Sequence, residues 1–205
     1  MTFTPMGKGD AMKLSKIFVF SLFAAVCLVS FPIDSFAQED GPRPSLAATV
    51  SQRLGTDTDI TVTYSRPGVK GRVVWGELVP HGLAAGNQYS DNKPFPWRAG
   101  ANENTTFECT GDLLVEGQSL PAGKYSIHMI PTESTWTIIF NNASDAWGSY
   151  GYDEAEDALR VTVTAVAAPH QEWLSYGFEN LAGTSATAYL HWEELKVPVK
   201  IELAN

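Results

Sequence analysis

Residues 159–166 alternate between apolar and polar side chains, and this period of two is the feature that most constrains the fold. Leu159, Val161 and Val163 are separated by polar residues such as Arg160 and Thr162. Successive side chains of a strand point to opposite faces of a sheet, so one face here is buried and the other meets water. Strand patterns recur at short spacing after residue 45, and no apolar pattern of period 3.6 reaches helical length. The chain is therefore predicted to be all-β.

Short turns separate the predicted strands. Glycine or proline stands within residues 116–118, 121–123, 131–134 and 182–184, where a chain reversal needs a special backbone angle. Connections this short indicate antiparallel hairpins. The predicted strands are residues 48–54, 60–64, 73–75, 105–110, 113–116, 124–130, 135–140, 159–166, 172–179, 185–192 and 196–202.

Half-buried strands without helices to cover them require a second sheet. The expected fold is an antiparallel β-sandwich, with a jelly roll as one possible arrangement, in a single domain over residues 45–205. Pro198 cannot donate a ladder hydrogen bond, so the last strand is expected to be an edge or to pair on one side only. Cys109 shares a strand face with Phe107, which favours a small buried apolar residue over a reactive thiol.

Residues 1–37 are typical of a secretory signal peptide. Three lysines precede an uncharged apolar run over residues 17–31, and a site of small residues ends at Ala37. We expect cleavage after Ala37, a periplasmic or secreted product, and a mobile polar lead-in over residues 38–44. The apolar run is shorter than the ~20 residues that span a bilayer, so no membrane span is expected in the mature chain. A membrane anchor, a start at Met12 and lipidation of Cys27 are the alternatives.

The mature chain is predicted to be acidic. Removing residues 1–37 lowers the count of Lys and Arg from 14 to 11 and that of Asp and Glu from 23 to 21, which gives a net charge of −10. Such a field repels phosphate backbones and anionic headgroups. Nucleic-acid binding is therefore not expected, and neutral or cationic ligands suit the chain better.

Arginine, aromatic, amide and carboxylate side chains are concentrated between residues 64 and 104. The segments are Tyr-Ser-Arg-Pro-Gly-Val-Lys-Gly-Arg at 64–72, Trp-Gly-Glu-Leu-Val-Pro-His-Gly at 75–82 and Pro-Trp-Arg-Ala-Gly-Ala-Asn-Glu-Asn at 96–104. With residues 120–131, 136–141 and 172–174, they resemble the bacterial domain-of-unknown-function family 2911 (DUF2911). The resemblance covers roughly residues 45–203 and implies no activity. The family pattern is shorter between 82 and 97, so residues 83–96 are a departure whose role stays open.

These polar and aromatic residues predict a ligand cleft. Arginine, asparagine and glutamate can grip hydroxyl groups, and aromatic rings can stack on the faces of a sugar. The alternative is structural, with salt bridges inside long loops and aromatic rings in the core. The candidate ligand-binding residues are Tyr64, Arg66, Arg72, Trp75, Trp97, Arg98, Asn102, Glu103 and His128.

Chemistry is harder to predict than binding. Glu103 and His128 are the candidate catalytic bases, because a histidine titrates near neutral pH and paired carboxylates hydrolyse glycosides. A hydrogen-bonded structural role for His128 is the alternative. The four histidines lack ligand spacing, the acidic run at 153–157 lacks the pattern of a calcium loop, and no phosphate loop, nucleophile elbow or dinucleotide motif occurs, so neither metal nor cofactor is expected.

Three functions follow from these observations. The first is a binding or accessory module for a neutral saccharide or another small polar ligand. The second is a hydrolase that uses Glu103 or His128, and the third is a structural protein of the cell envelope. The sequence leaves open whether the protein is an enzyme, and it leans toward binding.

Overall fold

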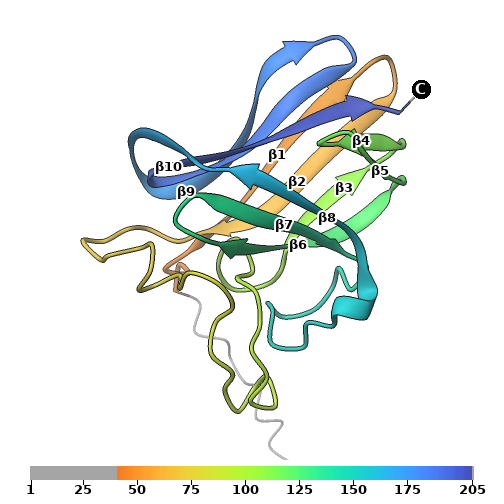
Figure 1. Cartoon of the computed structure of the whole chain (residues 1–205). Coiled ribbons are helices and arrows are strands. Elements are labelled where there is room, and N and C mark those ends of the chain that lie inside the picture. Colours follow the sequence, from red (N-terminus) through yellow and green to blue (C-terminus); the bar gives the residue numbers. More distant parts are fainter. Residues whose placement is uncertain (1–40, 205) are drawn as a thin grey trace, which may run out of the picture. The chain divides into compact units, whose positions relative to one another are not determined.

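The computed structural model describes residues 41–204, which form one compact unit of two antiparallel sheets (Figure 1). The six-stranded sheet has the order β1-β2-β3-β6-β7-β8, and the four-stranded sheet has the order β5-β4-β10-β9. The strands are β1 Leu46–Leu54, β2 Thr58–Arg66, β3 Thr105–Cys109, β4 Leu113–Val115, β5 Gln118–Leu120, β6 Gly123–Pro131, β7 Thr135–Asn141, β8 Asp157–Thr164, β9 Val166–Ala182 and β10 Ser185–Leu203. The predicted β-sandwich is confirmed. The predicted signal peptide and residues 38–40 of the lead-in lie outside the described residues.

Most strands pair with their neighbours in the chain, as the short turns predict. The β4–β5 hairpin turns through Glu116 and Gly117, which both have a positive φ, of 48° and 76°. Two successive residues with a positive φ form a tight turn whose twist matches that of the two strands it connects. Glycine adopts a positive φ without strain. The chain leaves the six-stranded sheet for this hairpin after β3 and returns with β6, so the connection is a meander with one excursion, not a jelly roll.

Three strand predictions need correction. Residues 73–75 form no strand, because the chain turns back at Gly76, where φ is 86°, and the amide of Val79 donates to the carbonyl of Val74. The short strand β5 was not predicted. Residues 185–203 form one strand instead of two, since β-bulges between His191 and Leu195 let β10 continue.

Pro198 lies between two differently paired parts of β10. Residues 185–196 pair with β9, and residues 201–203 pair with β4. Each part therefore takes hydrogen bonds from one side, as the proline predicts.

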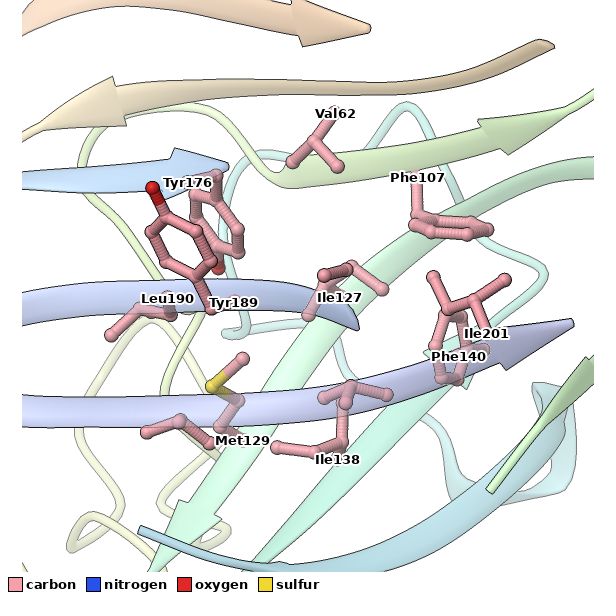
Figure 2. Close-up of a pocket in the computed structure, with 13 residues that line it drawn as sticks. Val62, Phe107, Ile127, Met129, Ile138, Phe140, Tyr176, Tyr189, Leu190 and Ile201 are labelled. Carbon is pink, nitrogen blue, oxygen red and sulfur yellow. The ribbon is translucent and has the colours of Figure 1, made fainter. Parts of the chain in front are cut away.

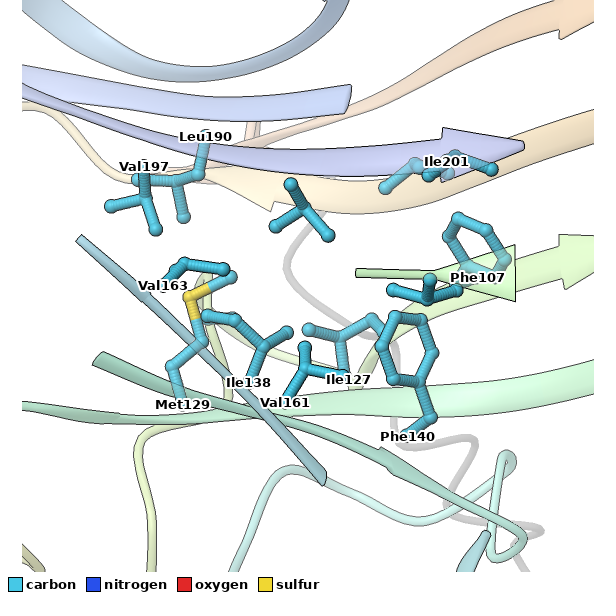
Figure 3. Close-up of a cluster of buried hydrophobic side chains, with 14 of the residues drawn as sticks. Phe107, Ile127, Met129, Ile138, Phe140, Val161, Val163, Leu190, Val197 and Ile201 are labelled. Carbon is cyan, nitrogen blue, oxygen red and sulfur yellow. The ribbon is translucent and has the colours of Figure 1, made fainter. Parts of the chain in front are cut away.

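The core fills the space between the sheets (Figure 3). Alternate side chains of every long strand point inward, among them Ile60, Phe107, Ile138 and Val161. Cys109 lies among them with 2% of its surface exposed, and burial raises the pKa of its thiol, which confirms the apolar interpretation. A void of about 30 Å³ remains between the layers (Figure 2), which is too small for anything larger than one or two water molecules. The interior is therefore a packed core without space for a ligand.

The outer face of the six-stranded sheet is divided into two parts. Over β6 and β7 it is covered by residues 142–156, which include the 3₁₀ helix Glu154–Glu156. Over β2 and β3 the outward residues, such as Thr61, Thr63 and Glu108, remain half-exposed or exposed. The covering loop and the long β2–β3 connection project from the same end of the sandwich (Figure 1). Most of the predicted site residues lie in that connection.

Candidate functional site

Arg66 and Arg72 hold the start of the β2–β3 connection by donating to main-chain carbonyls. Arg66 donates from Nε to the carbonyl of Leu174 at 2.8 Å, which ties the connection to β9 of the other sheet. Arg72 donates from Nε to Val69 at 3.1 Å and from Nη2 to Gly68 at 2.5 Å, which closes the turn around itself. Neither guanidinium is paired with a carboxylate among residues 41–204.

Trp75 and Trp97 belong to a cluster of four tryptophans at this end of the core. The ring of Trp75 lies edge-on to those of Trp97, Trp136 and Trp192, with centroids 5.9, 4.9 and 5.6 Å apart. Trp97 lies nearly parallel to Trp192, at 6.1 Å and 20°. Trp136 and Trp192 are almost fully buried, whereas Trp75 and Trp97 are half-buried. Tyr64 is also buried and packs edge-on against Tyr176 at 4.8 Å.

Arg98 and Asn102 fasten the end of the same connection. Arg98 donates from Nη1 to the carbonyl of Asn102 at 2.5 Å, and its guanidinium lies 4.9 Å from the ring centre of Tyr150. Gly148 packs so closely on this guanidinium that a Cβ atom there would collide with it. Asn102 has a positive φ of 61° and donates to the carbonyl of Ser45 at 3.1 Å. Both side chains therefore join loops to one another.

Glu103 follows Asn102 in the same segment, and its side chain is about half-exposed. Its carboxylate accepts a hydrogen bond from Arg43 at 2.6 Å, which ties residue 43 of the predicted lead-in to the domain. A hydrogen bond with its own backbone and the bond from Arg43 lower its pKa. Glu103 is therefore ionised at neutral pH and is suited to accept hydrogen bonds.

His128 is enclosed between β6 and the covering loop. It points to the outer face of the sheet, as the alternation of β6 predicts, yet only 2% of its surface is exposed. Its Nε2 atom lies 2.9 Å from Ser126 Oγ, and its Nδ1 atom lies 2.7 Å from Ser149 Oγ. Burial lowers the pKa of His128 to about 4, so the imidazole is neutral at physiological pH. This geometry matches the hydrogen-bonded structural alternative.

A second polar network fixes the covering loop to β8. Asp157 Oδ2 accepts hydrogen bonds from Tyr152 at 2.7 Å and from Arg160 Nε at 2.5 Å, and Asp157 Oδ1 accepts one from Asn141 at 2.8 Å. The acidic run at 153–157 is a 3₁₀ turn capped by the carboxylate of Asp153. Within residues 41–204 no three side chains of the metal-ligating types are grouped to hold an ion. Sequence reasoning missed this network, because its members come from separate segments and nothing in the sequence links them.

Two hollows border the predicted site residues. The end hollow, of about 280 Å³, lies between the turn after β2 and residues 97–101, and Arg72, Trp97 and Trp192 line it. The sheet-face groove, of about 340 Å³, lies on the outer face of β2, β3 and β6, and Glu103 lines it. The predicted set is therefore divided. Arg72 and Trp97 meet at one hollow, Glu103 lies at the other, and Tyr64, Arg66, Trp75, Arg98, Asn102 and His128 line neither.

Two tryptophans that border these hollows were not among the predicted site residues. Trp192 lies in an alternating strand and gives no signal beyond core packing. Trp147 stands in an irregular segment, Asn-Asn-Ala-Ser-Asp-Ala-Trp-Gly at 141–148, and 59% of its surface is exposed. The sequence signal that could have identified Trp147 is the presence of an aromatic residue in a polar loop.

No curated protein and no solved structure matches the chain significantly. In the described part of the chain, no helix has the length and apolar character needed to cross a bilayer. A family model does match, over residues 45–201, and its description reads "Protein of unknown function (DUF2911)". Since this match covers most of the chain, the protein belongs to the DUF2911 family.

Proposed function

We propose that the protein is an exported binding module whose end hollow takes a small, neutral, polar ligand such as a single sugar unit. The observation that carries this proposal is the meeting of a half-buried indole and an arginine at one hollow. Trp97 and Arg72 come from two of the three sequence segments that first indicated a site, and both line the end hollow.

The size of the hollow limits the ligand. Its volume of about 280 Å³ lies just below the roughly 300–1,000 Å³ that is typical of ligand pockets. A monosaccharide or another compact polyol suits this space, whereas a polymer does not. The proposed neutral charge agrees with the acidic character of the chain, which disfavours anions.

The chemistry of the lining matches such a guest. The face of Trp97 offers an apolar surface to the C–H groups of a sugar ring. Arg72 is exposed and uses Nε and Nη2 for main-chain carbonyls, and among residues 41–204 no acceptor is bonded to its Nη1. That nitrogen is a fixed donor for a hydroxyl oxygen, because the two internal bonds hold the guanidinium plane in place.

Binding is favoured over hydrolysis by the position of the candidate bases. His128 is enclosed by two serines, and neither it nor Glu103 lines the end hollow. The arginines of the connection do fasten loops, as the structural alternative requires, although they do so through carbonyls instead of the ion pairs that were expected. We therefore propose a binding module in which some arginines fasten the loops and another, Arg72, lines the ligand site.

Isothermal titration calorimetry against a panel of neutral monosaccharides tests this proposal. We expect one or more sugars to bind and Arg72→Gln to weaken that binding roughly 10- to 100-fold, because a hydrogen bond to a charged donor contributes about 1.5–3 kcal/mol. Trp97→Phe should keep part of the affinity, since a smaller ring still offers a stacking face.

Arg53→Gln is the matched control. Arg53 forms an exposed pair with Asp59 on the β1–β2 hairpin and lines neither hollow. Its replacement should leave binding unchanged. A panel without any response, or equal losses in the Arg53 and Arg72 variants with both folds intact, would refute the proposed site.

A further inference from the structure

The sheet-face groove is a second concave surface, and it shares no lining residue with the end hollow. Its floor is the uncovered outer face of three neighbouring strands. Thr61 and Thr63 come from β2, Thr106 and Glu108 from β3, and Lys124 from β6. In the strand register Thr61 faces Glu108, which in turn faces Lys124, so these polar side chains form a row across the sheet. Three strands span about 10 Å, which gives the floor the length of an extended ligand.

One wall of the groove carries an exposed indole. Residues 144–147 of the covering loop form this wall, and Trp147 has 59% of its surface exposed. The other five tryptophans of the chain are more deeply placed. Four belong to the buried cluster, and Trp173, on β9, is 37% exposed and lies beneath Lys70. A large indole left open beside a polar floor provides a stacking platform that core packing does not explain.

Asn104 fastens the wall of the same groove. Its side chain lines the groove and is buried, with 7% of the residue exposed. Its Nδ2 atom donates to the carbonyl of Ala143, and its backbone amide donates to the carbonyl of Ala146, so Asn104 holds the wall that carries Trp147. Its Oδ1 atom has no partner in the described residues. This oxygen is itself almost inaccessible, so Asn104 shapes the groove by holding its wall in place.

The charges of the groove select against anions. Glu103, Glu108 and Asp145 line it, and Lys124 is the one basic side chain that does. Phosphate polymers and acidic glycans are therefore disfavoured. A protein partner is also disfavoured, because the lining beyond Trp147 lacks the apolar centre of a stable interface. Carboxylates and threonine hydroxyls of the lining can accept hydrogen bonds from a guest that is rich in hydroxyl groups.

We propose that the sheet-face groove binds a neutral oligosaccharide. A sugar ring stacks on Trp147, and the following units lie across the row of Thr61, Glu108 and Lys124, with their hydroxyls donating to the carboxylates. The groove is independent of the end hollow. A polysaccharide chain, too large for the end hollow, is the ligand that this surface fits.

Tryptophan fluorescence tests the groove directly, because Trp147 is the most exposed indole of the described chain. The probes are cellohexaose, maltohexaose and xylohexaose, with polygalacturonate as the anionic comparison. We expect at least one neutral hexamer to shift the emission to shorter wavelength in a saturable way. Trp147→Ala should weaken calorimetric binding about tenfold or more, and Glu108→Gln should weaken it by a smaller factor.

Trp173→Ala is the matched control, since it removes a partly exposed tryptophan from β9, which belongs to the other sheet. Binding that survives in this variant and is lost in Trp147→Ala supports the proposal. Absence of binding by all three neutral hexamers at roughly 1 mM, equal affinity in the Trp147 variant, or preference for polygalacturonate overturns it. Arg72→Gln must leave hexamer binding intact, so the two sites succeed or fail separately.

Discussion

At the scale of single residues, the polar side chains around the long loops are mostly satisfied by the protein itself. Arg66 and Arg98 each reach a main-chain carbonyl, and His128 is held by two hydroxyls. A loop far from any strand ladder leaves carbonyls that need donors, and arginine supplies several from one side chain. The residues that remain open to a ligand are consequently few, and they can be tested one at a time.

His128 predicts how stability depends on pH. Burial sets its folded pKa at about 4, below the unfolded value of 6.5, so the unfolded chain binds more protons as the pH falls. The contribution of the neutral, buried His128 to the free energy of unfolding is fully present above about pH 6.5 and is lost as the pH falls toward about 4. It amounts to roughly 3 kcal/mol over that window. Urea unfolding at pH 7.5 and pH 4.5 should show this loss in the wild-type protein and a smaller one in His128→Gln.

His81→Gln is the control for that experiment, because His81 is exposed. It should reproduce the wild-type dependence on pH. A wild-type and a His128→Gln curve that run parallel between pH 7.5 and pH 4.5 would show that the enclosed imidazole is not the titrating group.

Candidate residues were identifiable from the sequence, but their partners were not. The concentration of Arg72 and Trp97 in one stretch did predict two residues that line one hollow. Nothing in the sequence indicates that Arg66 meets the carbonyl of Leu174, because main-chain acceptors are the same at every position. For the same reason the sequence could not show that Glu103 and Arg72 line different hollows.

At the scale of elements, the strands were predicted where side chains alternate over several residues, as in β8. The sequence failed where backbone geometry decides the outcome. Residues 73–75 have strand propensity but turn back at Gly76, and β10 crosses a bulge at Glu193, where φ is 57°. The covering loop, residues 142–156, had no periodic pattern to predict its position on the outer face of β6 and β7.

Asp157 is predicted to hold that loop in place. Its side chain is 8% exposed and accepts hydrogen bonds from Tyr152, Arg160 and Asn141. Asp157→Asn leaves the guanidinium of Arg160 without its main partner, so we expect the unfolding free energy to fall by roughly 2–3 kcal/mol. Chemical denaturation measures the change.

Asp59→Asn provides the comparison for this element. Asp59 pairs with Arg53 in the open, where both side chains are well exposed, and solvent screening leaves such pairs a small contribution to stability. If the two variants lose the same stability, the network at Asp157 is no stronger than a surface pair.

At the scale of the whole molecule, the sequence predicted two facing antiparallel sheets. Half-buried strands have one apolar face, and without helices a second sheet is the simplest way to cover it. The packed interior agrees with this reasoning, and it directs the search for ligands to the outer surfaces. The second cysteine of the chain, Cys27, is in the predicted signal peptide, so the domain keeps Cys109 alone and depends on its core for stability.

Export is the prediction that belongs to the complete chain. When the full sequence is produced in a bacterium, we expect the mature protein outside the cytoplasm to begin at Gln38, as N-terminal sequencing and intact mass would show. Ala37→Arg should block this processing, because the peptidase site requires a small residue. A product that keeps residues 1–37, or one that begins at a lipid-modified Cys27, would contradict the predicted site.

The divided pairing of β10 also sets an order for assembly. Its last residues, 201–203, are the partners that join β4 and β5 to the long hairpin of β9 and β10. The small hairpin of β4 and β5 therefore joins its layer through partners that lie far along the chain, so these contacts have a large sequence separation. Because contacts between distant residues close long loops, we expect this layer to form late in folding.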